Sequence, residues 1–373
     1  MNKQRLIAEL QSHGLRLVDS DIGAAGRKGG AGPSDHKAVT VEGTTVMVPI
    51  YTGSAARSPY SLQLSPERDR GTLLLDDRPI APLQFPDRPR FYDLTTADGI
   101  PYWKIALLHS RDVLATTVLQ TCMRYRDSAT ACQFCAIEQS LAADRTIARK
   151  TPAQLAEVAE AAARLDGVKQ VVMTTGTPNT GDRGAAYLSE CAQAIKARTN
   201  LPIQAQCEPP DDFGWFDRLR SAGVDSLGMH LEAANPEVRA RIMPGKAEVP
   251  LDYYFKAFAA AVDVFGRGQV STYLLAGLGD SLADLVGMCD RLIQMGVYPF
   301  VVPFVPVSNT PLANAPAPSS DFMFAVYQQV GDLLKRHQLF SADIKAGCAK
   351  CGACSALSTF ETESSAIATP EQQ

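Results

Sequence analysis

Short runs of apolar residues alternate with longer amphipathic stretches through most of the chain beyond residue 111. The apolar runs are rich in Val, Ile and Leu and have the length of buried β-strands. The predicted strands lie within residues 112–121, 170–177, 202–208, 224–233, 269–280 and 298–307. The predicted helices lie within residues 151–165, 184–198, 211–223, 251–266, 281–296 and 320–339. Strands that alternate with helices form parallel βαβ units, so we expect an α/β fold built on a partial (β/α)6 TIM-like barrel.

The first 110 residues have a different pattern. Residues 1–18 have the polar and apolar spacing of an amphipathic helix, and residues 38–51 and 71–85 read as β-strands broken by turns. The glycine-rich stretch 23–32 invites a phosphate-binding interpretation, but it lacks both the Lys-Ser/Thr ending of a P-loop and a clear preceding strand, so a flexible loop is favoured. We therefore expect a helix and a small β-rich domain at 1–110, the barrel at 111–340 and a cysteine-rich tail at 341–373.

Composition narrows the class of protein. Apolar residues make up 46% of the chain and charged residues 20%, which is typical of a globular protein. The net charge is −4 and Lys and Arg are scattered singly, so no nucleic-acid-binding face is expected. The chain has no long apolar run and no secretory signal pattern at its start. These features predict a cytoplasmic protein that binds neither nucleic acid nor membrane.

Six of the nine cysteines form two groups, Cys122, Cys132 and Cys135, and Cys348, Cys351 and Cys354. An odd number of cysteines with two tight groups makes a poor disulfide framework, whereas grouped thiols in a reducing compartment suggest metal ligands. Three thiolates leave one iron of a 4Fe–4S cluster open to another ligand. A closed zinc site would need four ligands, and no His or fourth Cys lies near the first group. Three incidental buried thiols are the remaining alternative, and the open cluster is favoured.

The predicted strands end in polar, glycine-rich or thiol-bearing segments, and in a barrel these carboxyl-terminal strand ends carry the chemistry. A cysteine group after the first strand, with Phe134 directly before Cys135, resembles the radical S-adenosylmethionine (SAM) superfamily, and biotin synthase and lipoyl synthase within it. The common spacing in that superfamily is three residues and then two. Here the intervals are nine and two, which departs from the pattern at the first interval.

Further segments resemble the SAM-binding parts of those enzymes. Residues 173–177 resemble the Gly-Gly-Glu segment of those enzymes but lack its Glu, and residues 230–246 resemble their fourth-strand region. Residues 274–281 resemble the Gly-Leu-Gly-Glu segment, with Asp280 in place of Glu, and residues 303–312 resemble the ending of the sixth strand. By this resemblance Phe134 packs near the adenine, the backbone from Thr174 to Thr177 holds the amino group, and Glu232 contacts SAM. Arg239 or Arg241 would pair with the carboxylate, because a guanidinium fits a carboxylate bidentately. The residues assigned to SAM are Phe134, Thr174, Thr175, Gly176, Thr177, Glu232, Arg239, Arg241, Gly277 and Gly279.

The second cysteine group lies on the tail at two-residue intervals, and Gly347 and Gly352 favour a loop around a metal over a helix. The run resembles ferredoxin loops, which indicates an auxiliary iron–sulfur cluster with Cys207 or the substrate as a further ligand. Structural zinc, completed by His337, is the alternative. Cys191 and Cys289 fall within predicted helices and are interpreted as core thiols.

The resemblance implies a radical SAM enzyme that cleaves SAM reductively with a 4Fe–4S cluster and generates a 5′-deoxyadenosyl radical, which abstracts hydrogen from a small-molecule substrate. It also implies an external electron donor such as a flavodoxin or ferredoxin. A narrower resemblance, to a radical SAM family encoded beside nitrilases in bacterial gene clusters, suggests nitrile-related metabolism. The radical must be shielded from solvent, and the glycine-rich segment or the cysteine tail is a candidate lid.

Two other classes of protein remain open. A non-enzymatic iron–sulfur protein, for electron transfer or as a scaffold, would explain the thiols but not the SAM-like strand ends. A zinc-stabilised barrel with polar catalysis would need an acid–base group, and His230 is the only His at a predicted strand end. No catalytic acid or base is named.

Overall fold

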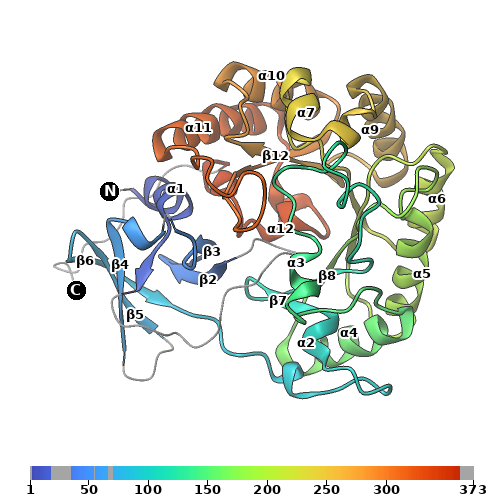
Figure 1. Ribbon diagram of the computed structural model, residues 1–373, viewed down its shortest axis with the longest axis horizontal. Coiled ribbons are helices and arrows are strands. Elements are labelled where there is room, and N and C mark those ends of the chain that lie inside the picture. The colour runs from blue at the N-terminus through green and yellow to red at the C-terminus, as the bar shows by residue number, and fades with distance from the viewer. Residues whose placement is uncertain (1, 18–34, 54, 66–69, 362–373) are drawn as a thin grey trace.

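The protein is described by a computed structural model that covers residues 2–17, 35–53, 55–65 and 70–361. A seven-stranded sheet forms the larger part of the fold, in the order β13-β12-β11-β10-β9-β8-β7 (Figure 1). Strands β8 to β13 are mutually parallel, and β7 pairs with β8 in the antiparallel sense. The predicted α/β fold with a partial barrel is confirmed, since each of the six predicted strand segments coincides with one parallel strand to within two residues at its start. The strands are β7 (Leu107–His109), β8 (Val113–Thr117), β9 (Gln170–Thr174), β10 (Ile203–Gln206), β11 (Ser226–Gly228), β12 (Val270–Ala276) and β13 (Val297–Pro303).

Helices cover the outer face of this curved sheet (Figure 1). The long helices are α4 (Pro152–Asp166), α5 (Ala185–Lys196), α6 (Gly214–Ser221), α9 (Leu251–Phe265), α10 (Leu282–Gln294) and α11 (Ser320–His337). The shorter helices are α2 (Tyr102–Ile105), α3 (Gln139–Ala142), α7 (Pro236–Ile242), α8 (Pro244–Ala247) and α12 (Cys348–Cys351), and 3-10 turns lie at Ala55–Arg57, Arg90–Asp93, Ser341–Asp343 and Leu357–Phe360. Helix α4 begins as its sequence predicts, because the Thr151 hydroxyl accepts from the Gln154 backbone and the Gln154 side chain accepts in return. Among the described helices, none is both long enough and apolar enough to cross a membrane.

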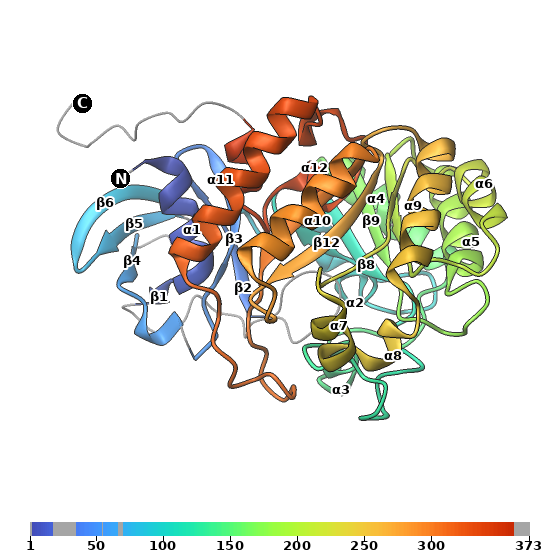
Figure 2. The same cartoon turned by 90° about the horizontal axis from the view of Figure 1, so that it is seen from above.

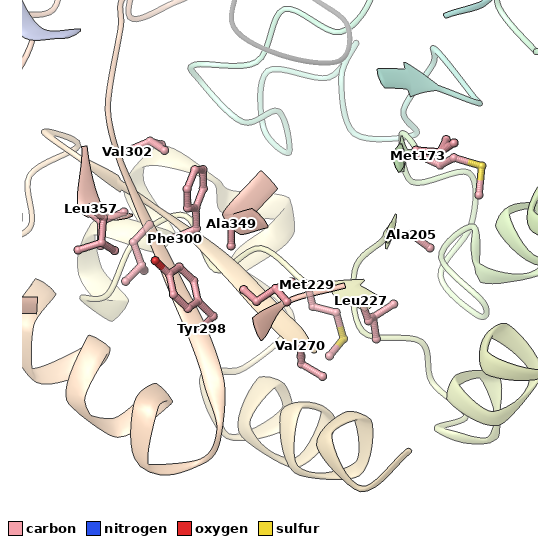
Figure 3. Packing of buried hydrophobic residues seen from close by; sticks show 14 of the residues in the cluster. Met173, Ala205, Leu227, Met229, Val270, Tyr298, Phe300, Val302, Ala349 and Leu357 are labelled. Atoms are coloured by element: carbon pink, nitrogen blue, oxygen red, sulfur yellow. The ribbon is translucent and has the colours of Figure 1, made fainter. Parts of the chain in front are cut away.

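The two faces of the barrel strands differ in chemistry. Alternate residues point to opposite faces of a strand, and the residues that pack toward the helices, such as Met173, Ala205 and Leu227, are fully buried and apolar. Figure 3 shows part of this core. The residues that point into the barrel include Gln204 and Gln206, both buried. A barrel interior is ordinarily filled by branched apolar side chains, so amides at these positions indicate that something polar is held inside.

The N-terminal region forms a second sheet beside the barrel. Helix α1 (Lys3–His13) precedes six strands, which are β1 (Arg16–Leu17), β2 (His36–Val41), β3 (Thr44–Pro49), β4 (Tyr60–Leu64), β5 (Arg70–Leu75) and β6 (Arg78–Gln84). Their order is β1-β4-β5-β6-β2-β3, and every pairing except β1 with β4 is antiparallel. Helix α1 packs against α11 and against β3 of its own sheet (Figure 2). The glycine-rich stretch 23–32 lies outside the described residues.

The C-terminal tail runs inside the barrel. Its backbone N–H groups donate to side chains near the amino-terminal ends of the strands: Gly347 to Gln170 (2.6 Å), Cys348 to Gln204 (3.2 Å), Ala346 to Ser226 (3.3 Å) and Lys345 to Gln269 (3.0 Å). Helix α12 therefore lies in the middle of the molecule (Figure 1). Two expectations are corrected here. The tail is not a lid over the strand ends, because it fills the opposite end of the barrel, and its cysteine run contains one helical turn before Gly352 takes a left-handed conformation.

The tail also joins the two sheets. The Ala353 carbonyl accepts hydrogen bonds from the Met47 backbone of β3 at 2.7 Å and from the Gln11 side chain of α1 at 3.1 Å. The Gln4 side chain of α1 donates to the Thr359 carbonyl at 2.7 Å. The N-terminal region therefore covers the side of the barrel between its two edge strands, with the tail packed beneath it.

Replacing Gln204 with Ala should destabilise the protein. This fully buried amide accepts from the Cys348 backbone and from Gln206 and donates to Ser271. Leaving buried partners without hydrogen bonds costs about 1–3 kcal/mol for each group. We expect a lower midpoint of thermal unfolding at a fixed scan rate. Gln294→Ala is the control, because that exposed side chain donates its hydrogen bond to Asp290 on its own helix. Equal midpoints for both variants would contradict the role assigned to the barrel amides.

Candidate functional site

A cavity of about 440 Å³ occupies the barrel interior, and both cysteine groups line it. Cys122, Cys132 and Cys135 contribute from the loop after β8, at the carboxyl-terminal ends of the strands. Cys348, Cys351 and Cys354 contribute from the tail on the opposite side. Cys207, at the end of β10, also lines the cavity, whereas Cys191 and Cys289 are buried in α5 and α10. Two cysteine groups separated by more than 200 residues in the sequence thus face one space.

The long interval between Cys122 and Cys132 is taken up by a folded turn. The Arg124 side chain is only 6% exposed and forms an ion pair with Glu208 at the end of β10. The Thr130 carbonyl accepts from the backbone of Gly245 in α8 at 3.1 Å, which holds the turn against that helix. The inserted residues therefore return the chain to the cavity, so all three cysteines can share it. Arg124 is thus buried beside the site, whereas Arg126 of the same turn is largely exposed.

The segment Thr174–Thr177 is hydrogen-bonded directly to the cysteine loop and lines the cavity. The Gly176 backbone donates to the Leu119 carbonyl, and the Met123 backbone donates to the Thr177 carbonyl, both at 2.9 Å. A Cβ atom on Gly176 would lie 2.1 Å from the Thr121 carbonyl oxygen. Only glycine permits this approach, which explains the glycine that the sequence places in this segment.

Paired charges surround the cavity near the first cysteine group. Glu208 is bound by Arg124, by Arg183 and by the Thr177 hydroxyl. Burial alone would raise the pKa of Glu208, but the neighbouring Lys246 and Arg124 cations hold it below its usual value. Every charge of this group therefore has a partner in the described residues.

Glu232 follows β11 and pairs with Lys246 of α8 at 3.0 Å, and both side chains line the cavity. Burial opposes the charge on Lys246, but the nearby Glu232 carboxylate raises the pKa of Lys246 above its usual value. His230 lies in the same wall. Burial lowers its pKa to about 4, which makes it a neutral imidazole at physiological pH.

The structure brings some of the residues assigned to SAM to the cavity and leaves others away from it. Those that line it are Phe134, Thr174, Thr175, Gly176, Thr177 and Glu232, and those that do not are Arg239, Arg241, Gly277 and Gly279. Arg239 is 2% exposed, donates to the Leu231 carbonyl at 2.6 Å and lies over the Tyr254 ring. Arg241 donates to the Leu278 carbonyl at 3.2 Å. Both guanidinium groups thus hold the loops of the barrel rather than face the site.

The glycines of the 274–281 segment serve close packing. A Cβ atom on Gly279 would lie 2.5 Å from the Arg241 guanidinium, and one on Gly277 would lie 2.9 Å from Pro318. Asp280 accepts hydrogen bonds from the backbones of Ala234 and Asn235, which shapes the loop after β11. Lys246, Glu208 and His109 are among the cavity residues for which the sequence indicates no role. Glu208 ends the third strand, so its position was the one available signal.

The second cysteine group has its own polar neighbours. The Gln206 side chain donates to the Cys348 sulfur at 3.2 Å, and the Cys354 sulfur lies 3.4 Å from His109 Nε2. His337, the expected zinc ligand, is not among them, because it lies at the outer end of α11 with its Nε2 3.9 Å from Asp290. The zinc alternative with His337 as its fourth ligand is therefore wrong.

Thiols of both cysteine groups have raised pKa values. Burial raises the pKa of Cys132 to about 12, of Cys135 to about 11 and of Cys351 to about 12, so without a bound cation these thiols stay protonated. A metal centre would displace the protons and stabilise the thiolates. Within the described residues, no three His, Cys, Asp or Glu side chains converge as ligands of a single ion. The donor set fits a polynuclear iron–sulfur group, which spreads its thiolates over several irons.

Comparison with known proteins identifies the family of the central part of the chain. A family model described as the radical SAM superfamily matches residues 125–292, which include Cys132, Cys135 and strands β9 to β12. Residues 125–292 thus form a radical SAM domain. Among curated proteins, the chain is 34% identical over 140 residues to bacteriochlorophyllide c C-7(1)-hydroxylase of Chlorobaculum limnaeum, across 37% of this chain and 35% of that protein. A probable dual-specificity RNA methyltransferase of Moorella thermoacetica is 26% identical over 33% of this chain and 35% of that protein. The matches thus span about a third of the length of these relatives.

Two solved structures also match this chain. Methylornithine synthase is 18% identical, with a TM-score of 0.46 over 58% of this chain and 61% of that one. A radical SAM methyltransferase from Sphaerobacter thermophilus is 16% identical, with a TM-score of 0.46 over 80% of this chain and 81% of that one.

Replacing Gly176 with Ala should reduce the iron content of the reconstituted protein. The added methyl group would meet the Thr121 carbonyl and push the cysteine loop away from β9. Gly181→Ala, in the same loop between β9 and α5, is the matched control, since the nearest atom to its Cβ is 3.7 Å away. We expect iron and sulfide per chain, after anaerobic reconstitution, to fall in the first variant only. Wild-type iron content in Gly176→Ala would show that the close contact is dispensable.

Proposed function

We propose that this chain is a radical SAM enzyme in which Cys122, Cys132 and Cys135 hold a 4Fe–4S cluster with one open iron. When bound, this cluster and SAM together supply reductive cleavage of SAM to a 5′-deoxyadenosyl radical, which abstracts hydrogen from a small molecule. The observation that carries the proposal is the meeting of these three cysteines with Thr174–Thr177 at one rim of the cavity. In a (β/α) barrel, this rim is where catalysis takes place.

The residues proposed to hold SAM follow from that rim. Phe134 packs with Phe304, Val238 and Ile242, which makes an apolar wall suited to an adenine. The backbone of Thr174–Thr177 and the Glu232 carboxylate supply polar contacts. We assign the SAM carboxylate to Lys246, because this cation lines the cavity whereas Arg239 and Arg241 do not. On SAM binding, Lys246 exchanges its ion pair with Glu232 for one with the SAM carboxylate. The buried charge of Lys246 thus stays compensated.

The substrate is proposed to bind in the cavity between the two cysteine groups. Val113, Ala115 and Val172 supply apolar surface there, and His230 and Tyr273 supply polar groups. The tail and the N-terminal region exclude water from this space, and a reactive radical requires such exclusion. The cavity volume suits a small molecule. The added N-terminal region and the tail cysteines are also what support a place in the nitrilase-associated family, and with it a substrate of nitrile-related metabolism.

Cys348, Cys351 and Cys354 are proposed to hold a second iron–sulfur centre. Two observations support this second centre. Gln206 donates a hydrogen bond to the Cys348 sulfur, and the three cysteines line the cavity in which the substrate is proposed to bind. Hydrogen bonds to sulfur tune such centres. A zinc ion at these thiols is the alternative, and metal analysis separates the two.

An external donor, such as a flavodoxin or ferredoxin, is proposed to reduce the first cluster. The exposed Met123, 51% accessible, and the exposed Arg126 lie on the turn next to Cys122 and offer a contact surface for an acidic redox protein. Nine free cysteines favour a reducing compartment, which supports a cytoplasmic location.

Single Cys→Ala replacements at 122, 132 and 135 test the proposal. Each should abolish release of 5′-deoxyadenosine from SAM by the reconstituted, reduced protein, because the cluster would lose one of its three protein thiolates. Cys191→Ala is the control, since this thiol is buried in α5 away from the cavity. Release by all three variants at the level of the control would mean that another site binds SAM, and a wild-type protein that binds zinc alone would exclude the proposed activity.

A further inference from the structure

One imidazole shares the deep wall of the cavity with the tail cysteines. His109 ends the edge strand β7, is 8% exposed and lines the cavity together with Cys348, Cys351 and Cys354. Its Nε2 atom lies 3.4 Å from the Cys354 sulfur. The sequence separates these two residues by more than 200 positions, so only the passage of the tail through the barrel brings them together.

The distance between the two atoms suits ligands of one metal ion. For metal–sulfur and metal–nitrogen bonds of about 2.3 and 2.1 Å, a separation of 3.4 Å corresponds to an angle of roughly 100° at the metal, close to the tetrahedral value. Cys348 and Cys351 lie one helical turn apart, at the two ends of α12. In a two-iron cluster each iron takes two protein ligands, so these two thiols are the candidates for the second iron.

Cys348 and Cys351 are surrounded by hydrogen-bond donors, as metal-bound sulfur atoms commonly are. Cys348 has two hydrogen-bond donors, the Gln206 amide at 3.2 Å and the Tyr273 hydroxyl. The Ser110 hydroxyl, directly after His109, hydrogen-bonds to Cys351. Donors of this kind stabilise thiolates and are typical of iron–sulfur sites, whereas an incidental buried thiol needs none of them.

The backbone around the centre is also fixed. The Gln204 side chain fills the space where a Cβ atom of Gly347 would lie, at 2.3 Å, and it accepts from the Cys348 backbone. The Ser355 hydroxyl donates to the Val301 carbonyl of β13. The tail is thus anchored to the barrel on both sides of its cysteine run, which holds Cys354 beside β7.

From this geometry we propose that His109 is the fourth protein ligand of the second iron–sulfur centre, together with Cys348, Cys351 and Cys354. The proposal rests on the second centre proposed above and adds a ligand that the sequence does not indicate. Three thiolates and one imidazole give two ligands to each iron of a two-iron centre, so the second centre is closed while the first keeps an open iron. Imidazole replaces thiolate in known types of iron–sulfur centre and raises their reduction potential.

The test uses the full chain, reconstituted anaerobically with iron and sulfide and reduced in the absence of SAM. Pulsed EPR detects the hyperfine coupling of a nitrogen bound to iron. We expect this coupling in the wild type, and we expect His109→Cys to remove it while iron and sulfide per chain stay at the wild-type level. His36→Ala is the matched control, since His36 lines the same cavity from β2, and the coupling should persist in it.

A second arm removes the first centre by replacing Cys122, Cys132 and Cys135 together with Ala. The iron that remains should show the nitrogen coupling, although this variant cannot cleave SAM. An unchanged coupling in His109→Cys, or its loss in His36→Ala, would overturn the ligand assignment while leaving the radical SAM activity intact. Absence of iron and sulfide from the triple variant, with its circular dichroism unchanged, would overturn the second centre itself. Failure of the wild type to release 5′-deoxyadenosine is a separate result that bears only on the proposed function.

Discussion

The interior of this protein depends on hydrogen bonding of a buried peptide backbone. Residues 345–348 of the tail lie within a barrel, where no strand can pair with them, and unsatisfied backbone groups are costly there. Gln170, Gln204, Ser226 and Gln269 accept the N–H groups of this segment. Because these side chains project from four positions around the sheet, they fix both the depth and the direction of the tail. The second cysteine group consequently faces the first across one cavity.

The same constraint gives a role to the N-terminal region. A partial barrel leaves its two edge strands apart, and an uncovered side would admit water to the cavity. Helix α1 and strand β3 both bind the Ala353 carbonyl, so the region covers this side only when the tail is in place. The added N-terminal and C-terminal parts of the chain thus form a single closure around the site.

The sequence predicts the barrel well because its signals are local. Strand segments, helix caps such as Thr151 and the glycine of the 173–177 segment all express short-range chemistry, and the structure contains the corresponding elements. The cysteine loop was also recognisable, although the nine-residue interval was not explained until Arg124 was seen to pair with Glu208. That ion pair joins two loops that the sequence keeps 84 positions apart.

The missed features are long-range. Arg239 has the residue type expected of a carboxylate-binding side chain. Its guanidinium instead donates to backbone carbonyls and lies over an aromatic ring, and the cation that lines the cavity is Lys246. His337 is near the tail in sequence and far from its cysteines in space, while His109 is the reverse. For His337, proximity in the chain suggested a shared site with the tail cysteines, and the passage of the tail through the barrel separates them instead.

The central claim is that two iron-binding cysteine groups face one cavity from opposite ends. A crystal structure of the anaerobically reconstituted protein, with diffraction measured at the iron absorption edge, tests this claim most directly. We predict two separate iron positions inside the barrel, one beside Cys122, Cys132 and Cys135 and one beside Cys348, Cys351 and Cys354. A single iron position, or a second one outside the barrel, would contradict the account.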